Sequence, residues 1–351
     1  MRVAALTSGK NIPSARFRIR QYIPYLQSQG IVITDYCPVI SQAARLPGAL
    51  GRIRTRYLPP VMAAQAALNL AARIPGIVGS YRADVTWLER NFIPNLDDLA
   101  GLLKHPIVLD IDDAIWLYSP FGESIIKRLV RRADMVFAGN SFIADWCSNY
   151  CKAVQIIPTA IDCDRFKPRM EARSRTAPFV VGWTGTSGNF RFLKMIEPAL
   201  AKFLAANSDA RLLVVADQKP CLASLPQSQL VFKPWQAETE HLVLHEMDVG
   251  VMPIDDSDIS RGKCSFKMLQ YMAAGLPVIV SPYGMNQQVL AEGKIGFRAV
   301  TIDDWFDALN LCLICRKDLP IMGSRGRNAV IVKYSVEVVA KSIVNGFGKV
   351  C

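Results

Sequence analysis

The segment Arg261-Gly-Lys-Cys-Ser-Phe-Lys-Met-Leu-Gln-Tyr-Met-Ala-Ala-Gly-Leu-Pro-Val-Ile-Val-Ser281 predicts a helix, a tight Gly-Leu-Pro turn and a buried strand. Similar short apolar runs, bounded by Gly, Asp or Pro, occur along the whole chain and are separated by stretches with helical spacing. This alternation is typical of parallel α/β sheets, whose strands are covered by helices on both faces. The chain is therefore predicted to be an α/β protein.

The expected strands fall into two sets, and each set is sufficient for one sheet. The first set lies at residues 2–7, 31–36, 84–88, 106–111, 135–139 and 154–158, and the second at residues 178–183, 211–216, 229–232, 249–253, 277–281 and 296–300. The charge-rich, Pro-flanked segment 164–178 between them is typical of an interdomain linker. We predict two Rossmann-like parallel-sheet domains facing a cleft, at residues 1–170 and 171–332, with a C-terminal helix at 333–351 returning to the first domain.

Length and composition agree with this plan. A chain of 351 residues suggests two domains at about 150 residues each. Apolar residues make up 51% and charged residues 20%, which excludes a disordered, collagen-like or disulfide-scaffold chain. The nine Cys are scattered, and the N-terminus runs directly into the first expected strand without a signal peptide. We therefore expect a cytoplasmic protein in a reducing compartment.

The net charge of +11 is concentrated in the first half. Residues 1–177 contain 23 Lys and Arg against 14 Asp and Glu, whereas residues 178–351 contain 18 against 16. Residues 36–83 have no acid and six Arg, at positions 45, 52, 54, 56, 73 and 82. This stretch fits either an anionic membrane surface or a helix packed on the sheet with solvated arginines. It does not span a bilayer, because its uncharged run at 57–72 is 16 residues, below the roughly 20 required.

The helix in the opening segment has a polar face formed by Lys263, Lys267 and Gln270. Two lysines one turn apart near a helix N-terminus suit a diphosphate, because the free N–H groups and the helix dipole also favour anions. Gln270 lies one turn further on, where its amide group can bind a ribose hydroxyl. An ordinary amphipathic helix with solvated lysines has the same pattern, so both interpretations stay open.

A glycine-containing loop follows the first strand of the second set. In Phe179-Val-Val-Gly-Trp-Thr-Gly-Thr-Ser-Gly-Asn189 the glycines would allow backbone amides to approach a phosphate. Their spacing differs from the dinucleotide fingerprint G-x-G-x-x-G, which disfavours an NAD-dependent oxidoreductase. A plain strand-to-helix turn is the alternative.

Two charged groups follow strands of the first set. Asp110, Asp112 and Asp113 lie at the end of a strand, where carboxylates bind a metal, act as a general base, orient a hydroxyl or cap a helix. We expect Asp112 and Asp113 to be functional, because adjacent acids repel unless a partner uses them. Arg16 and Arg20 can share one face of the helix after the first strand, as phosphate ligands or as a solvated pair.

Together these pieces resemble family 4 glycosyltransferases, the group 1 type with the two-Rossmann GT-B architecture, over almost the whole chain. The most specific resembling pieces are Ile157-Pro-Thr-Ala-Ile-Asp-Cys-Asp-Arg-Phe-Lys-Pro168, Gly182-Trp-Thr-Gly185 and the block from Lys263 to Ser281; the others are 13–26, 110–116 and 133–141. The resemblance implies transfer of a sugar from a nucleotide-diphosphate donor to a saccharide or lipid-linked acceptor hydroxyl, usually with retention, in cell-surface polysaccharide or glycoconjugate synthesis. It implies no cofactor, no metal and no nucleic-acid partner, and it suits a peripheral position at an anionic membrane surface.

The resemblance also assigns site residues. The diphosphate would contact Lys263, Lys267 and the loop formed by Gly185, Thr186 and Ser187. Gln270 stands where the family has the ribose-binding second Glu of E-x7-E, and Gly262 stands in place of the first Glu, which contacts the transferred sugar. Asp112 lies where relatives place a catalytic His or Asp, and Asn140 and Ser141 line the same cleft in the family. We therefore predict Asp112 and Asp113 as catalytic, with Arg16 and Asn140 as further donor-binding residues.

Several alternatives remain open at this stage. Asp110 and Asp112 could form the metal-binding D-x-D of a GT-A transferase. The same two-domain architecture also occurs in nucleotide-sugar 2-epimerases. A catalytically impaired nucleotide-sugar-binding protein is suggested by Gly262 and Gln270. In the NAD-dependent alternative, Asp217 at the end of a strand would bind the ribose.

Overall fold

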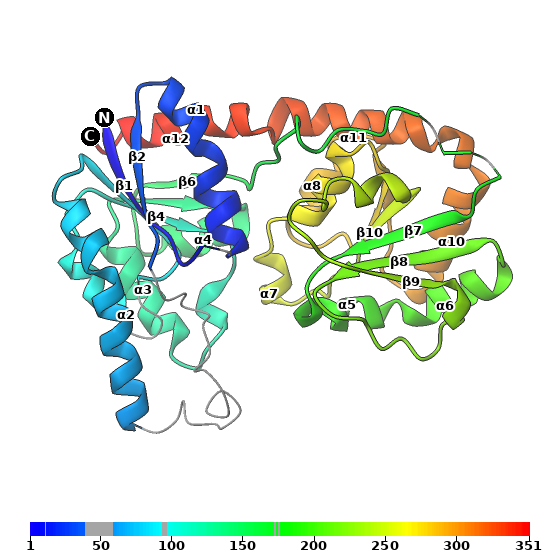
Figure 1. The fold of residues 1–351 in the computed structure, drawn as a ribbon, viewed down its shortest axis with the longest axis horizontal. Coiled ribbons are helices and arrows are strands. Elements are labelled where there is room, and N and C mark those ends of the chain that lie inside the picture. The colour runs from blue at the N-terminus through cyan, green and yellow to red at the C-terminus, as the bar shows by residue number, and fades with distance from the viewer. Residues whose placement is uncertain (11, 39–58, 93–96, 172, 175) are drawn as a thin grey trace. The chain divides into compact units, whose positions relative to one another are not determined.

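The chain folds into two units, each built around a six-stranded sheet (Figure 1). One unit contains Met1–Ala160 together with Val339–Cys351, and the other contains Ile161–Val338. This computed structural model describes residues 1–351 except residues 11, 39–58, 93–96, 172 and 175. The expected α/β class with two parallel sheets is confirmed. The units divide at residues 160 and 338, where the sequence suggested 170 and 332.

The sheet of the first unit has the order β2-β1-β3-β4-β5-β6, and all its pairs are parallel. Every residue of β3 and β4 is buried, because these central strands are covered on both faces. The strands coincide with the expected ones to within a few residues: β1 (Arg2–Leu6), β2 (Val32–Tyr36), β3 (Val85–Glu89), β4 (Ile107–Ile111), β5 (Met135–Ala138) and β6 (Val154–Ile156).

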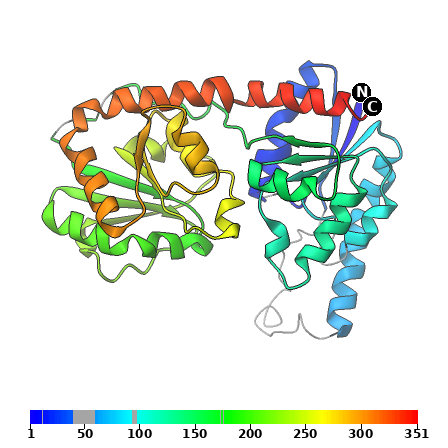
Figure 2. The ribbon, with the colours of Figure 1, turned by 180° about the vertical axis from the view of Figure 1, so that it is seen from behind.

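Helices connect these strands, as parallel pairing requires. They are η1 (Ala15–Ile19), η2 (Arg20–Tyr22), α1 (Ile23–Ser28), α2 (Pro59–Ser80), η5 (Asp97–Leu102), η6 (Ile115–Leu117), α3 (Gly122–Arg132) and α4 (Ser141–Ser148). The last helix, α12 (Val336–Gly348), ends in the first unit, beside the N-terminus (Figure 2). There the buried Phe347 ring packs against Trp87 and Phe137, with centroids 5.2 and 5.8 Å away.

Helix α2 accounts for part of the acid-free segment. Its Arg73 side chain is buried and donates to the carbonyl oxygens of Thr7 and Phe92, at 2.7 and 2.9 Å. The expectation of solvated arginines is therefore wrong for Arg73, because the guanidinium satisfies carbonyl groups that burial would otherwise leave without donors. Arg82 is exposed, whereas the arginines at positions 45, 52, 54 and 56 lie outside the described residues.

The sheet of the second unit has the order β12-β11-β10-β7-β8-β9 and is also parallel. Its strands are β7 (Phe179–Thr184), β8 (Ala210–Ala216), β9 (Leu230–Pro234), β10 (Val249–Met252), β11 (Val278–Val280) and β12 (Gly296–Arg298). Its α-helices are α5 (Phe190–Met195), α6 (Glu197–Ala206), α7 (Asp258–Arg261), α8 (Phe266–Ala273), α9 (Met285–Leu290), α10 (Ile302–Ile314) and α11 (Leu319–Lys333).

A glycine on β10 lets α8 pack closely on this sheet. A Cβ atom at Gly250 would lie 2.3 Å from the ring of Tyr271, which is fully buried on α8. Gly182 on β7 makes room for the sulfur of Met247 in the same way. Helix α8 is therefore fixed against β10, and its polar residues are fixed with it.

The segment expected as an interdomain linker, 164–178, is bound to the second unit. Arg165 donates to the carbonyl oxygen of Ala237, and Arg169 donates to those of His245 and Met247 at 3.0 and 2.9 Å. These side-chain hydrogen bonds attach the irregular segment to the carbonyl groups of the second unit and satisfy those groups at the same time. The segment therefore belongs to the body of this unit.

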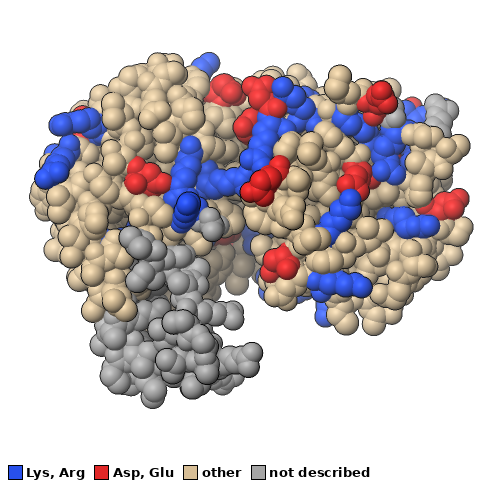
Figure 3. Space-filling view, in the orientation of Figure 1, with Lys and Arg blue, Asp and Glu red and all other residues tan. Residues whose placement is uncertain are grey.

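Among the described residues, no helix combines the length and hydropathy needed to cross a membrane. The same residues contain no group of three or more His, Cys, Asp or Glu arranged to hold a metal ion. On the face drawn in Figure 3, basic side chains occur on both units, and those of the second unit are interspersed with acidic ones.

Candidate active site

Each sheet has a point where the strand order reverses, and ligands of such sheets bind there, beyond the carboxyl ends of the strands. In the first unit this switch point lies between β1 and β3, and in the second it lies between β7 and β10. Most of the predicted site residues follow strands at these two edges.

In the first unit, Glu89 organises the switch point. It is the last residue of β3, is fully buried, and accepts hydrogen bonds from the backbone N–H and the hydroxyl of Ser8, both at 2.7 Å. The hydroxyl of Ser14 donates to its other oxygen. A single carboxylate thus fixes the loop after β1 to the end of β3, because a buried charge requires several donors.

The predicted catalytic pair, Asp112 and Asp113, follows β4 and is bound by one arginine. Arg90 donates from Nε to Asp112 and from a terminal nitrogen to Asp113, the latter at 2.9 Å. Burial raises the pKa of Asp112, but the Arg90 guanidinium outweighs it, and the net pKa lies below the ordinary value. The carboxylate of Asp112 therefore stays ionised near neutral pH and acts as a hydrogen-bond acceptor.

Asp110 is placed differently. Its side chain is 1% exposed and accepts a hydrogen bond at 2.7 Å from Nε of Arg18, which is itself fully buried. Burial raises the pKa of Asp110 to about 6, although Arg18 lowers it. The alternative of a GT-A transferase with a metal on Asp110 and Asp112 is wrong, because the fold has two parallel sheets and Asp110 forms an internal ion pair.

Arg16 and Arg20 do not act together. Residues Ala15–Ile19 form a π-helical turn, and the next three residues form a 3-10 turn, so the expected α-helical face is not formed. Arg20 donates to Asp35 at 2.6 Å and to the loop after β1, whereas the half-buried Arg16 lies over the ring of Phe17 at 4.6 Å.

Asn140 lies at the end of β5, at the same edge of the sheet. It is 2% exposed, and its Oδ1 accepts a hydrogen bond at 2.9 Å from the backbone N–H of Ile143. The side chain therefore caps helix α4, which is an established structural use of Asn at this position.

In the second unit, the loop after β7 contains Gly185, Thr186 and Ser187. A Cβ atom at Gly185 would lie 2.3 Å from the ring of Trp183, so the close approach requires glycine. The backbone N–H and the hydroxyl of Ser187 both donate to Asp217, at 2.6 and 2.7 Å. Burial raises the pKa of Asp217, but these bonds outweigh it and leave the pKa below its ordinary value. The loop after β7 is thus held by hydrogen bonds to Asp217, the residue that follows β8.

Helix α8 begins only at Phe266, so Lys263, which was expected on this helix, precedes it, whereas Lys267 lies in its first turn and Gln270 in its second. Nζ of Lys267 donates to Oε1 of Gln270 at 3.1 Å, and Gln270 is 3% exposed. Both lysines are half-buried, and Nζ of Lys263 lies 6.0 Å from the centroid of the Phe192 ring on α5. Lys267 and Gln270 are therefore paired on the helix, and Lys263 lies shortly before its N-terminus; we call the three residues the lysine cluster.

The structure brings this cluster close to the loop after β7. The hydroxyl of Tyr271 on α8 accepts a hydrogen bond at 2.7 Å from the backbone N–H of Thr184, the last residue of β7. The contact between Lys263 and Phe192 joins the same two regions. At the switch point of the second sheet there is therefore a basic helix start beside a tight glycine loop, an arrangement suited to a diphosphate.

Sequence reasoning missed Glu89, Arg90 and the pairing of Arg18, and it named Asp217 only as a ribose ligand and not as the partner of Ser187. Glu89, Arg90 and Arg18 each hold a predicted residue or its loop, and Asp217 holds Ser187. A signal existed for Glu89, Arg90 and Asp217, because they directly follow expected strands, where ligand-binding loops begin.

Comparisons with known proteins agree with this geometry. Residues 179–313 match the family model described as "Glycosyl transferases group 1". A search of curated protein sequences found no match.

Solved structures resemble the whole chain. A sucrose-phosphate synthase from Thermosynechococcus elongatus has 15% identity and a TM-score of 0.72, with 99% of this chain and 98% of that chain covered. Anabaena HepE, solved with UDP and glucose, has 14% identity and a TM-score of 0.71, with 99% and 100% covered. A glycosyltransferase from Rickettsia africae has 14% identity and a TM-score of 0.67, with 99% and 98% covered. At this identity the likeness shows the fold.

Proposed function

We propose that the chain is a glycosyltransferase that transfers a sugar from a UDP-sugar to a saccharide or lipid-linked acceptor hydroxyl, because its residues 179–313 match the group 1 glycosyltransferase model. The second unit would bind the donor, and the first unit would bind the acceptor. UDP is proposed as the nucleotide because structures of similar fold were solved with UDP or UDP-glucose.

The observation that carries the proposal is the lysine cluster of Lys263, Lys267 and Gln270 on and just before α8, a helix that Tyr271 joins to the end of β7. Nζ of Lys267 is held by Gln270, so a cation is already oriented where a diphosphate would bind. The departing nucleoside diphosphate gains negative charge in the transition state. Preorganised donors stabilise such charge by a few kcal/mol each, because they need no reorganisation.

The loop after β7 would shape the pocket for the diphosphate. The N–H and hydroxyl of Ser187 donate to Asp217, so the positive charge of the site comes chiefly from the lysines and from the amide dipoles of α8. Gly185 would allow the donor to approach the backbone closely.

On the acceptor side, Asp112 and Asp113 would position sugar hydroxyls. Arg90 keeps Asp112 ionised and fixes its orientation, so this carboxylate can accept a hydrogen bond from an acceptor hydroxyl or from the transferred sugar. The acid-free, Arg-containing sequence at 36–83 suits a lipid-linked acceptor at an anionic membrane surface.

The proposal is tested by titrating the chain with UDP, GDP and ADP and following its melting temperature. UDP should stabilise the protein, by about 2.7 kcal/mol at a hundredfold excess over Kd. The Lys263→Ala/Lys267→Ala variant should lose this stabilisation. Equal stabilisation of the native and variant chains by UDP would contradict the assigned site.

A second candidate is a nucleotide-sugar-binding protein without transfer activity. It is favoured by Gly262, which ends α7 directly before the lysine cluster and has no side chain to contact a sugar. Binding of UDP-glucose without release of UDP, in the presence of a set of saccharide acceptors, would support this candidate over the transferase.

A further inference from the structure

A basic cavity of about 810 Å³ lies within the second unit, apart from the lysine cluster of α8. It is lined by the segment around Arg169 and Arg173, by Asp248 before β10, by the turn before β11, and by residues of and before α11. Asp248 also accepts a hydrogen bond from the backbone N–H of Val180 on β7. The cavity is therefore at the amino ends of the strands, the opposite edge of the sheet from the proposed donor site.

The cavity lining is strongly cationic. Five basic side chains line it but only one carboxylate, that of Asp248, among the described residues. The basic residues are Arg169, Arg173, Arg316, Lys317 and Arg327. Its volume lies within the range of about 300–1,000 Å³ that is usual for small-molecule sites.

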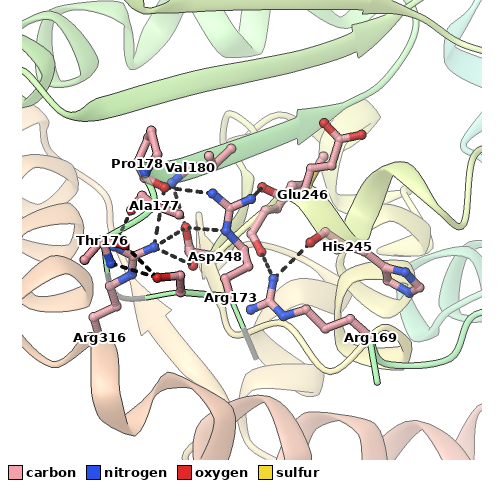
Figure 4. Close-up of polar contacts among 12 residues, drawn as sticks. Arg169, Arg173, Thr176, Ala177, Pro178, Val180, His245, Glu246, Asp248 and Arg316 are labelled. Carbon is pink, nitrogen blue, oxygen red and sulfur yellow. Dashed lines mark hydrogen bonds and ion pairs between the residues drawn. The ribbon is translucent and has the colours of Figure 1, made fainter. Parts of the chain in front are cut away.

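The arginines donate mainly to backbone carbonyl oxygens (Figure 4). Arg169 donates to His245 and Met247, and Arg173 donates to Glu246 and Pro178. Carbonyl groups orient a guanidinium but leave its net charge uncompensated. These bonds therefore place several positive charges around the cavity without neutralising them.

The single carboxylate is shared. Asp248 is 4% exposed and lies 3.4 Å from Arg173 and 3.3 Å from Arg316, whose side chains are each 19% exposed. Burial lowers the pKa of Arg169, and the nearby Arg173 and Arg316 lower it further against the opposing effect of Asp248. The positive charges here therefore repel one another, and an anion would relieve that repulsion.

The rest of the lining is apolar. Two aliphatic residues of the lining are exposed to solvent, Ile314 by 76% and Ile331 by 42%. The other apolar lining residues include Leu276, Leu319 and Pro320. Exposed aliphatic side chains beside a cationic group suit a ligand that has a charged head and an apolar body.

We propose that this cavity is a second anion site, which binds a ligand bearing a phosphate or diphosphate group. Arg169, Arg173 and Arg316 form its inner wall, and Lys317 and Arg327 supply further charge. The ligand is either a free phosphorylated metabolite or the headgroup of an anionic lipid. The site rests on the geometry of the second unit and does not depend on the proposed transferase reaction.

Calorimetric titration with inorganic pyrophosphate tests the site in the full chain. The lysines of the donor site are first removed with Lys263→Ala/Lys267→Ala, so that the cavity can be examined alone. Lys317→Glu and Arg169→Gln are then added separately, with Lys294→Glu as a matched control, because Lys294 is exposed in the same unit and is absent from the lining. Lys317 is also exposed, so its replacement leaves the core untouched.

We expect saturable binding that Lys317→Glu and Arg169→Gln each weaken at least about tenfold, as for the loss of one charge-assisted hydrogen bond. Lys294→Glu should leave the affinity unchanged. The proposal fails if pyrophosphate does not bind saturably, or if Lys317→Glu has no larger effect than Lys294→Glu.

A vesicle arm separates the two sources of the ligand. The same variants are sedimented with phosphatidylcholine vesicles that contain or lack phosphatidic acid. Binding that requires phosphatidic acid and is lost in Lys317→Glu supports the site with a lipid headgroup as ligand. Pyrophosphate binding without vesicle binding supports it with a soluble ligand.

Discussion

At the scale of single residues, Arg90 shows how one backbone conformation sets a site. Its φ of 55° lies in the left-handed region, which costs a non-glycine residue roughly 1 kcal/mol. Its N–H donates to the carbonyl oxygen of Asp110 at 2.8 Å, and its side chain reaches both Asp112 and Asp113. The strained turn therefore holds the cation that keeps the two acids together.

Replacing Arg90 with Gln should lower stability near neutral pH and make stability less sensitive to acid. The pKa of Asp112 is lowered in the folded state, so its contribution is present above the unfolded pKa and is lost as pH falls through the folded pKa. Without the guanidinium, burial raises the folded pKa of Asp112 toward or above its unfolded value, so this contribution is already absent near neutral pH and acid has less left to remove. Urea unfolding should show a loss of about 1–3 kcal/mol in the free energy of unfolding near neutral pH, and this difference from the native chain should shrink as the pH falls.

Arg2→Gln provides the matched control, because Arg2 pairs with Asp84 on the surface, with side chains 69% and 44% exposed. Its effect should stay within about 1 kcal/mol. If the stability of Arg90→Gln follows the same pH curve as that of the native chain, Arg90 does not set the ionisation of Asp112.

Replacing Lys267 with Ala should weaken donor binding. A charge-assisted bond to phosphate is worth about 1.5–3 kcal/mol, so the Kd for UDP should rise roughly 10- to 100-fold. Titration calorimetry measures this directly, with Lys294→Ala as the control. An unchanged Kd for UDP would show that Lys267 does not contact the nucleotide.

The sequence predicted which residues stand at strand ends but not what binds them. The pair of Lys267 and Gln270 followed from helical spacing, because residues three apart share a face, whereas the left-handed residue Ser265 ends that spacing before Lys263. The partners of Asp110 and Asp112 could not be found in this way. Arg18 and Arg90 come from other segments, and long-range pairs leave no local pattern.

At the scale of elements, the packing of α8 on β10 positions the lysine cluster. Gly250→Ala would place a methyl group 2.3 Å from the ring of Tyr271. We expect a loss of about 1–3 kcal/mol in the free energy of unfolding, measured in urea, because overpacking displaces the helix. UDP affinity should fall as well, since Tyr271 joins α8 to the end of β7.

Gly188→Ala is the control, because a Cβ there would meet only the Thr186 hydroxyl oxygen at 3.8 Å. If Gly250→Ala is no less stable than Gly188→Ala, the sheet has room for the methyl group and the packing argument is wrong.

The strands were predictable because buried parallel strands are continuous apolar runs. The turn after β1 was not. The sequence suggested one helix face with Arg16 and Arg20, but a π-helical turn at Ala15–Ile19 changes the register and leaves Arg18 directed at Asp110. Propensity does not distinguish such a turn from an α-helix, because tertiary contacts decide it.

At the scale of the whole molecule, helix α12 completes the first unit. Phe347 is fully buried against Trp87 and Phe137, so Phe347→Ala should destabilise that unit by about 3–5 kcal/mol. In calorimetry, the transition of the first unit should move to lower temperature while that of the second stays in place. Val332→Ala on α11, where Val332 is 57% exposed, should shift neither.

A Phe347→Ala variant that lowers both transitions equally would contradict the division of the chain. The sequence indicated two domains and the return of the C-terminus, because two sets of strands are separated by a charged segment. It could not place the boundaries, since the charges of segment 164–178 turned out to bind the second unit.

The first unit is assembled from both ends of the chain, with the second unit inserted between them. During synthesis, residues 161–338 leave the ribosome before residues 339–351. The inserted unit can therefore fold before α12 is available to pack on the first sheet. The apolar side chains that Phe347 covers stay accessible to chaperones throughout that interval. Ribosome pausing late in translation would therefore prolong the exposure of the first unit and leave the second unaffected.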